Sequence, residues 1–341
     1  MKVCIIGDGL VSLTLAKSLI QKEISVDILV IKKNKKYDKS RTIGISKSNF
    51  DFFNSEIIRI NKIAWEIKKI KIYTEKNFKK EILNFTNNNE KLFSMIKNYE
   101  LQKILKNNLK KSKYVRFKSV SKYNETFKDQ YNLIINCETN HQITKKFFSN
   151  KIKKNYNSFA ITTIINHRKL INNTAFQIFT KDGPLAFLPI SGTQTAIVYS
   201  IKSYKKKEPE IKYLINKFNP IYKDIKINNL NFFPLKSSHV RKYYNNNILA
   251  FGDLLHKIHP LAGQGFNMSL RDIKLISKLI DKKINLGLEI DKSICHEFQK
   301  KSQDKNYLFS TGIDLIYELF NLESKIKPNL LSKSIELIGK N

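Results

Sequence analysis

A segment with two closely spaced glycines, residues 248–272, has residue types that suit the binding of a flat, charged ring. It reads Ile-Leu-Ala-Phe-Gly-Asp-Leu-Leu-His-Lys-Ile-His-Pro-Leu-Ala-Gly-Gln-Gly-Phe-Asn-Met-Ser-Leu-Arg-Asp. Asp253 follows a predicted buried strand and can accept hydrogen bonds from the hydroxyls of a sugar alcohol. Gly263 and Gly265 let the backbone approach a ring, and the positive end of a helix starting near Phe266 can stabilise negative charge there. A reduced flavin carries such a charge, so the segment predicts a flavin site.

We assign structural roles to the histidines and cysteines, the other residues that could take part in catalysis. His256 and His259 could act as acid or base groups, but we interpret both as structural parts of this loop because its work is binding. His239 and His296 are placed in ordinary loop or helical contexts without a role. The three cysteines are too few and too dispersed for a disulfide framework or a metal site, so we expect no metal and a reducing cytoplasm.

A second glycine pattern, Gly7-Asp8-Gly9-Leu10-Val11-Ser12, stands between a predicted strand and a predicted helix. Gly7 suits a tight turn, Gly9 lets the backbone approach a pyrophosphate, and the small Ser12 takes the place of a third glycine. Asp8 puts a negative charge beside the expected phosphates. The acidic residue expected after the second strand is replaced by Ile31 and Lys32, and a lysine there favours NADP. The pattern predicts a dinucleotide site without naming the dinucleotide; the alternative is a tight turn without a ligand.

The elements around these loops predict an α/β fold. Residues 3–6 and 24–31 read as buried strands and 10–20 as the helix between them, which is the βαβ unit of a doubly wound sheet. Residues 131–137 form another buried strand. Short β-rich runs between 159 and 201, separated by turn signals, predict an inserted antiparallel sheet. Residues 266–280 form an amphipathic helix, and the last fifty residues are helical.

The formal net charge of +33 raises the possibility of nucleic-acid binding, but only six of the 62 basic residues are Arg. Lys is spread along the whole chain, which favours a solvated basic surface or attraction to anionic lipid over nucleic acid. No apolar run is long enough to span a bilayer. An amphipathic helix expected at 328–338 either docks on the core or contacts a membrane surface. We therefore expect a cytoplasmic protein that is either free in solution or peripheral on the inner face of a membrane.

The 252–267 segment resembles the Gly-Asp-x-x-His-x-x-His-Pro-x-x-Gly-Gln-Gly-x-Asn signature of flavin-dependent aromatic hydroxylases of the para-hydroxybenzoate hydroxylase type. The resemblance implies FAD as cofactor, with Asp253 after Gly252 holding the ribitol chain. It also implies that Pro260 lies beside the reactive edge of the flavin. The residues that would wrap the pyrimidine end are Gly263, Gln264, Gly265 and Asn267.

Within that superfamily, the chain is most similar to the ubiquinone-biosynthesis hydroxylases. Residues 41–46 resemble a segment of that family whose first residue contacts FAD, which implies the same role for Arg41. Residues 175–189 follow the pattern of the substrate sheet, and residues 298–320 keep the spacing of the final helices. Asn98 fits a helix whose first polar residue reaches the flavin.

The resemblance implies a Rossmann-like FAD-binding domain interleaved with an antiparallel β-sheet substrate domain and followed by C-terminal helices. The expected segments are FAD-binding parts at 1–68, 98–150 and 236–290, substrate-domain parts at 69–97 and 151–235, and a helical segment at 291–341.

The implied activity is hydroxylation of the aromatic ring of a polyprenylated phenol, with NAD(P)H and O₂, through a flavin hydroperoxide. The cofactor supplies the chemistry, so no nucleophile is expected. The implied partners are this phenol, a membrane surface and other proteins of quinone biosynthesis.

One segment departs from the family pattern, and this departure leaves two alternative functions open. The family usually has an Asp-Gly motif after the strand at 131–137, where this chain has Asn136-Cys137-Glu138-Thr139. The departure affects a segment that the family uses for FAD and NADPH contacts. The alternatives are a degenerate, non-catalytic partner in a quinone-biosynthesis complex and a related FAD oxidoreductase with another apolar substrate.

Overall fold

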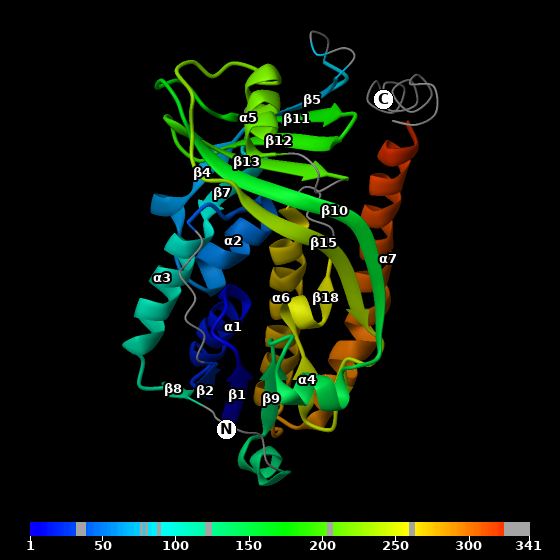
Figure 1. The fold of residues 1–341 in the computed structure, drawn as a ribbon. Coiled ribbons are helices and arrows are strands. Elements are labelled where there is room, and N and C mark those ends of the chain that lie inside the picture. The colour runs from blue at the N-terminus through cyan, green and yellow to red at the C-terminus, as the bar shows by residue number, and fades with distance from the viewer. Residues whose placement is uncertain are drawn as a thin grey trace.

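The computed structural model describes residues 1–31, 39–75, 78, 81–86, 90–119, 125–202, 207–258 and 263–323. Figure 1 shows two large sheets, one in the lower and one in the upper half of the molecule, with long helices beside them. The predicted helix at 328–338 lies outside the described residues. Among the described helices, none is both long and apolar enough to span a membrane.

The lower sheet has six strands in the order β16-β17-β9-β1-β2-β8. Their bounds are β1 Lys2–Ile6, β2 Ser25–Val30, β8 Val115–Ser119, β9 Leu133–Asn136, β16 Tyr244–Asn245 and β17 Ile248–Ala250. All neighbours are parallel except β16 and β17. The central strands β1 and β9 are continuous buried runs because a parallel sheet is covered on both faces. The predicted βαβ unit is confirmed.

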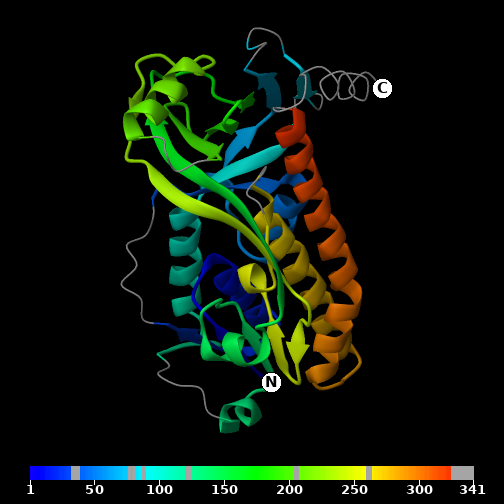
Figure 2. The ribbon, with the colours of Figure 1, turned by 45° about the vertical axis from the view of Figure 1, so that its right-hand side comes forward.

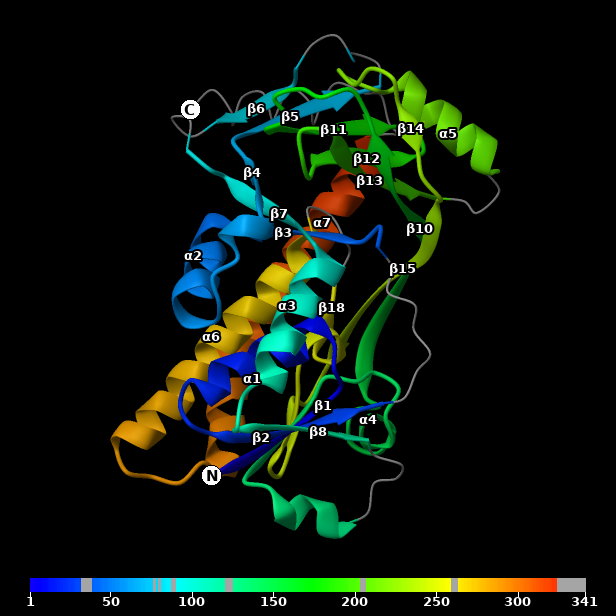
Figure 3. The ribbon, with the colours of Figure 1, turned by 90° about the vertical axis from the view of Figure 1, so that its left-hand side faces the viewer.

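Helices cover the lower sheet in a layer that Figure 3 shows from the side. α1 (Leu10–Ile20) packs against both α3 (Asn98–Lys110) and α6 (Gln264–Asn285), and α6 packs against α7 (Lys292–Glu323). The remaining helices are α2 (Lys47–Glu56), α4 (Gln142–Phe147) and α5 (Glu208–Lys217). The first turns of α1, α3 and α6 are therefore held in fixed positions by one helical layer.

The upper sheet has nine strands: β18-β15-β10-β13-β12-β11-β5-β6 in order, with β14 beside β10. The bounds are β5 Lys69–Thr74, β6 Leu83–Thr86, β10 Lys151–Asn166, β11 Thr174–Thr180, β12 Gly183–Pro189, β13 Gln194–Ile201, β14 Lys226–Ile227, β15 Asn231–Val240 and β18 His256–Lys257. The sheet is antiparallel as expected, except for the parallel pair β5 and β11. β15 also crosses residues 235 and 236, where a domain boundary was expected, and pairs with β10 on both sides.

β10 and β15 form a long ribbon that descends from the upper sheet beside α7 (Figure 2). The sequence predicts β10 only from Phe159, because residues 151–157 are polar and lack a repeating apolar side. They are nevertheless in the strand because they pair with β15 and contact α7, where Tyr156 donates to Asp314 and Lys154 pairs with Glu318.

A small antiparallel sheet connects the two halves. It consists of β3 (Thr42–Ser46), β7 (Phe93–Lys97) and β4 (Trp65–Ile67), in the order β3-β7-β4. Its apolar residues Ile67 and Met95 pack against Ile164, Ala175 and Ala196 of the upper sheet. β3 continues directly into α2, so this small sheet fixes the backbone that follows Arg41.

Candidate cofactor site

The first glycine loop, Gly7–Gly9, follows β1 and begins α1. Gly7 has a φ of +107°, which turns the chain out of the strand, and its N–H still donates to the Leu29 carbonyl of β2 at 2.9 Å. A Cβ on Gly7 would lie 2.9 Å from Glu138, whereas a Cβ on Gly9 would have no atom of the described residues within 4 Å. The loop is therefore closed against Glu138 at Gly7 and open at Gly9, where a ligand can approach the backbone.

Ser12 lies buried in the first turn of α1, as its small size allows. The neighbouring turn, Asn136–Thr139, is held by its own side chains. Asn136 Oδ1 accepts from the Glu138 N–H at 3.0 Å, and Thr144 Oγ1 donates to the Glu138 carbonyl at 2.5 Å. Burial raises the pKa of the Cys137 thiol to about 12, so this thiol is not a nucleophile at neutral pH.

The negative charge of Asp8 is paired with a positive charge from another element. Its Oδ2 lies 2.8 Å from Lys106 Nζ, and its backbone carbonyl accepts from Gln102 Nε2 at 3.0 Å. Both partners come from α3. The negative charge expected beside the phosphates is thus neutralised by a residue that lies 98 positions along the chain.

Asn98 and Arg41 lie side by side, because the Asn98 N–H donates to the Arg41 carbonyl at 3.0 Å. The Asn98 side-chain Oδ1 is buried and accepts no hydrogen bond from the described residues. The exposed Arg41 guanidinium lies 5.8 Å from the centre of the Phe233 ring. A buried acceptor without a donor is costly unless a ligand supplies the donor.

The turn after β17 packs on the start of α1. Gly252 has a φ of +62°, and a Cβ there would lie 3.1 Å from the Val11 side chain. Gly252–Leu254 forms a single 3₁₀ turn in which Asp253 is exposed. An exposed carboxylate beside the first glycine loop can accept hydrogen bonds from ligand hydroxyls.

The second glycine segment, Gly263–Asn267, forms the start of α6. Gly263 precedes the helix with a φ of +63°, and a Cβ there would lie 3.8 Å from the Gly44 nitrogen. Gln264 is the first helical residue, and a Cβ on Gly265 would meet no atom of the residues that the structure describes within 4 Å. Open backbone is therefore available at Gly265 as it is at Gly9.

Asn267 links α6 to β3 through its amide. Its Nδ2 donates to the Gly44 carbonyl at 2.8 Å, and its Oδ1 accepts from the Ser46 N–H at 3.0 Å and from Asn49 Nδ2 at 2.9 Å. These bonds occupy both lone pairs of the amide oxygen and one of its two N–H groups. The Asn267 side chain is therefore largely committed to the protein, and contacts of this segment with the pyrimidine end of a flavin would come mainly from backbone atoms.

His256 anchors β18 to the middle of α6. Its Nε2 lies 2.5 Å from Asp272 Oδ2, both side chains are buried, and Asp272 Oδ1 accepts from Asn306 Nδ2 of α7 at 3.1 Å. These contacts favour the structural interpretation of His256. The placement of His239 in a loop or helix is wrong: it lies in β15 opposite His256. Burial, with the nearby His256, lowers its pKa to about 4.

Contacts between neighbouring elements bring the candidate residues around one region. Asp8 contacts α3, the first residue of α3 contacts Arg41, Gly44 contacts Gly263, and Gly252 contacts α1.

Lys32, His259 and Pro260 lie outside the described residues. FAD fits the remaining set: its pyrophosphate needs open backbone N–H groups, its ribitol needs acceptors such as Asp253, and its donors can satisfy Asn98. Lys106 and Gln102 are the residues that sequence reasoning missed.

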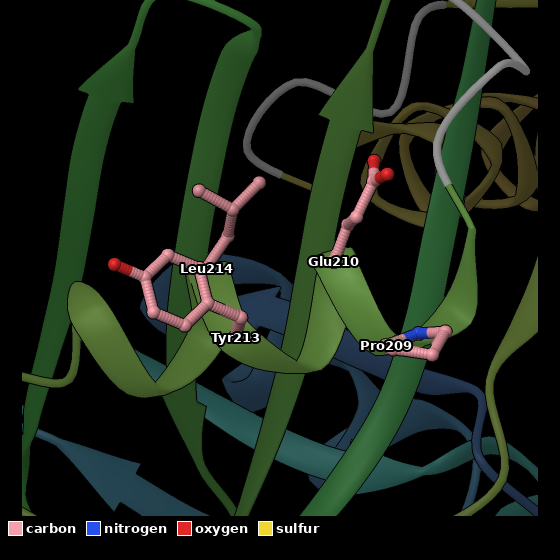
Figure 4. A pocket seen from close by; sticks show the side chains of 4 residues that line it. All are labelled: Pro209, Glu210, Tyr213 and Leu214. Atoms are coloured by element: carbon pink, nitrogen blue, oxygen red, sulfur yellow. The ribbon is translucent and has the colours of Figure 1, made fainter.

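A second hollow lies on the surface of α5, lined by Pro209, Glu210, Tyr213 and Leu214 (Figure 4). Its residues come from one helix on the outer side of the upper sheet, and none is among the candidate cofactor residues. The hollow is therefore not part of the site described above.

Comparisons with known proteins identify the family and the fold of this chain. A family model described as squalene epoxidase matches residues 130–331. The mitochondrial ubiquinone biosynthesis monooxygenase COQ6 of Dictyostelium discoideum is 23% identical, over 99% of this chain and 88% of that protein. The COQ6 of Danio rerio is 24% identical over 56% of this chain, which spans only 48% of that relative.

Among solved structures, HpxO of Klebsiella pneumoniae in complex with FAD has a TM-score of 0.79 at 11% identity, with 99% of this chain and 94% of that chain covered. Such a likeness shows the shared fold, which is the FAD-binding fold of the para-hydroxybenzoate hydroxylase type. Because the family model covers more than half of the residues, the chain belongs to the squalene epoxidase family of FAD-dependent monooxygenases.

Proposed function

We propose that the protein hydroxylates the aromatic ring of a polyprenylated phenol in ubiquinone biosynthesis, with FAD, NAD(P)H and O₂. The observation that carries this proposal is the match to a ubiquinone biosynthesis monooxygenase along 99% of the chain. In the balanced reaction, one oxygen atom enters the ring and the other leaves as water, while NAD(P)H is oxidised. Bound FAD would supply the redox chemistry, and the protein supplies binding and orientation.

The chain's own residues have defined parts in this proposal. Gly9 and Gly265 leave room for the cofactor against the backbone, and Asp253 and Asn98 offer acceptors to its hydroxyl and N–H groups. The starts of α1 and α6 direct positive dipole ends to the same region. None of these roles requires a side chain that transfers a proton.

The two faces of the upper sheet differ in a way that favours a bulky apolar substrate. The face toward α5 carries the large side chains of Ile161, Phe176, Leu185, Phe187, Ile197 and Tyr199, which pack with Ile211, Leu214 and Ile215 of α5. The opposite face has a cross-strand row made by Thr162, Val198 and Ala186, which are much smaller. The Thr162 hydroxyl lies 3.2 Å from that of Ser40, next to Arg41, so the row starts beside the cofactor site.

Gln177 continues this row, because it pairs with Ala186 of β12 on one side and with Ile72 of β5 on the other. Its side-chain Nε2 is buried and has no hydrogen-bond partner among the described residues. A substrate oxygen would satisfy this N–H, so the row supports an apolar ligand with an oxygen-bearing ring. We propose this row as part of the substrate surface.

The Gln177 assignment can be tested by Gln177→Leu. We expect the KM for the phenol to rise about threefold to tenfold, with little change in kcat, because one hydrogen bond to substrate is lost. The thermal midpoint should not fall, because the Gln177 side-chain N–H makes no hydrogen bond to the described part of the chain. An unchanged KM together with a lower midpoint would assign Gln177 to structure alone.

The activity itself is tested on the purified protein and in cells. A yellow protein whose flavin absorbance is bleached by NAD(P)H is expected. Deletion of the gene should cause a prenylated quinone precursor to accumulate, as identified by mass spectrometry. If no precursor accumulates and quinone levels hold, the pathway is wrong, and a related oxidation of another apolar substrate becomes the better hypothesis.

A second candidate function is that of a non-catalytic partner in a quinone-biosynthesis complex. It is favoured by Glu138, which lies against Gly7 where the family pattern has an Asp-Gly motif. A protein that stays colourless after incubation with FAD would favour this candidate and contradict the enzyme.

We also propose that the basic surface contacts an anionic membrane, because the net charge is +33 and the substrate is lipophilic. Sedimentation with vesicles of anionic phospholipid tests this. Binding should disappear in vesicles of neutral phosphatidylcholine; equal binding to both would contradict an electrostatic contact.

A further inference from the structure

Lys106 lies on α3 but acts on the first glycine loop. Its Nζ is 2.8 Å from Asp8 Oδ2, and the two side chains are only 24% and 28% exposed. Gln102, one helical turn earlier, donates to the Asp8 carbonyl at 3.0 Å. α3 therefore holds both the side chain and the backbone of Asp8.

The electrostatics of this loop explain why such a pair matters. Asp8 stands between Gly7 and Gly9, whose backbone is the expected pyrophosphate site, and Glu138 lies against Gly7. An unpaired carboxylate near a pyrophosphate repels it, and partial burial strengthens the repulsion. A loop with acidic neighbours needs a nearby cation to bind an anion well.

We propose that Lys106 is a cofactor-positioning residue that keeps Asp8 in a neutral pair facing α3, away from the pyrophosphate of FAD. Asp8 and Lys106 then act as one unit, and the acidic residue in the loop is tolerated only because its partner is present. The inference rests on FAD binding at this loop, as in the proposed function.

A double-mutant cycle tests the pair on protein freed of its flavin. The variants are Lys106→Met, Asp8→Asn and the double variant, with Lys110→Met as the matched control, since Lys110 is exposed at the end of the same helix. Each is titrated with FAD and followed by quenching of flavin fluorescence. Riboflavin, which lacks the pyrophosphate, is the second probe.

Lys106→Met should raise the Kd for FAD about tenfold, because Asp8 is then unpaired. The Kd of Asp8→Asn for FAD should equal that of wild type or be lower. The Kd of the double variant should lie within about twofold of wild type, and that of Lys110→Met should be unchanged. The deficit of Lys106→Met should shrink at high salt and be absent with riboflavin.

Three outcomes would overturn the inference. An unchanged Kd in Lys106→Met shows that Asp8 does not need neutralising. A double variant as weak as Lys106→Met shows that Lys106 contacts the cofactor directly and not through Asp8. A wild-type protein that binds neither FAD nor riboflavin contradicts the proposed function as well, whereas the first two outcomes leave that function intact.

Discussion

The first glycine loop and the second glycine segment both leave backbone open to a ligand, but different interactions hold them in place. Both present open backbone, at Gly9 and at Gly265. The first is held by a charged pair between Asp8 and Lys106 that is partly exposed, and the second by the buried, neutral amide of Asn267. A partly exposed ion pair contributes little to folding, whereas buried hydrogen bonds contribute much. We therefore expect changes at the first loop to affect cofactor affinity and changes at the second to affect stability.

The largest effect should come from Asp272→Ala in α6, which supports the second segment. The variant leaves the buried His256 imidazole and the Asn306 amide without their partner, and we expect a loss of about 3 to 5 kcal/mol in the free energy of unfolding. Urea denaturation measures it. The control is Asp281→Ala on the same helix, whose half-exposed carboxylate pairs with Lys22 and should contribute under about 1 kcal/mol. Equal losses would show that burial does not distinguish these pairs.

The next largest effect is expected for Asn267→Ala. The variant removes three hydrogen bonds between α6 and the segment 44–49, and we expect a loss of about 2 to 3 kcal/mol. The Ser46 amide should also exchange its hydrogen faster, as amide exchange measured by mass spectrometry would show. A stable variant with unchanged exchange at Ser46 would remove the distinction between the two regions.

Asp253→Ala should leave stability unchanged, because its side chain is exposed. The Kd for FAD should rise about tenfold to a hundredfold if the carboxylate accepts hydrogen bonds from ribitol hydroxyls. Flavin fluorescence titration measures this, with the exposed Asp304→Ala of α7 as control. Full flavin occupancy in Asp253→Ala would refute the role.

The smallest effects compare two glycines of one loop. Gly7→Ala should lower the free energy of unfolding by about 1 to 2 kcal/mol, because its φ is +107° and Glu138 blocks the Cβ. Gly9→Ala should change it by under about 0.5 kcal/mol, because its φ of −71° is ordinary and no described part of the chain lies within 4 Å of the added Cβ. Gly9→Ala should nevertheless weaken FAD binding. Thermal unfolding and FAD titration of both variants would expose any reversal of this order.

The sequence predicts the parts of the fold in which local pattern and burial agree. The run at 3–6, the helix at 10–20 and the strands between 159 and 201 have the apolar periodicity of their elements, and the structure contains each of them. β3, β4 and β7 were missed because three short strands carry too few residues for a period to be recognised. The polar start of β10 was missed because its partners, β15 and α7, are distant in the chain.

The candidate site shows the same limit. Gly7, Gly9, Gly252 and Gly263 could be identified from short motifs, because a turn or a helix start requires them locally. Lys106 could not, because its pairing with Asp8 depends on how α3 packs against α1. Asn267 belonged to a recognisable motif, but its bonds to β3 depend on the small sheet that the sequence did not predict.

The strand order of the lower sheet has a consequence for synthesis in the cell. β9 lies between β1 and β17, and β17 begins at residue 248. Until the ribosome has made that residue, the apolar β9 has an unpaired edge, and Asp253 does not yet exist. Nascent chains therefore present an unpaired strand edge from the synthesis of residue 136 until that of residue 248, a condition that favours aggregation. FAD can therefore bind only after Asp253 has been made, and added flavin can stabilise only chains that have reached this length.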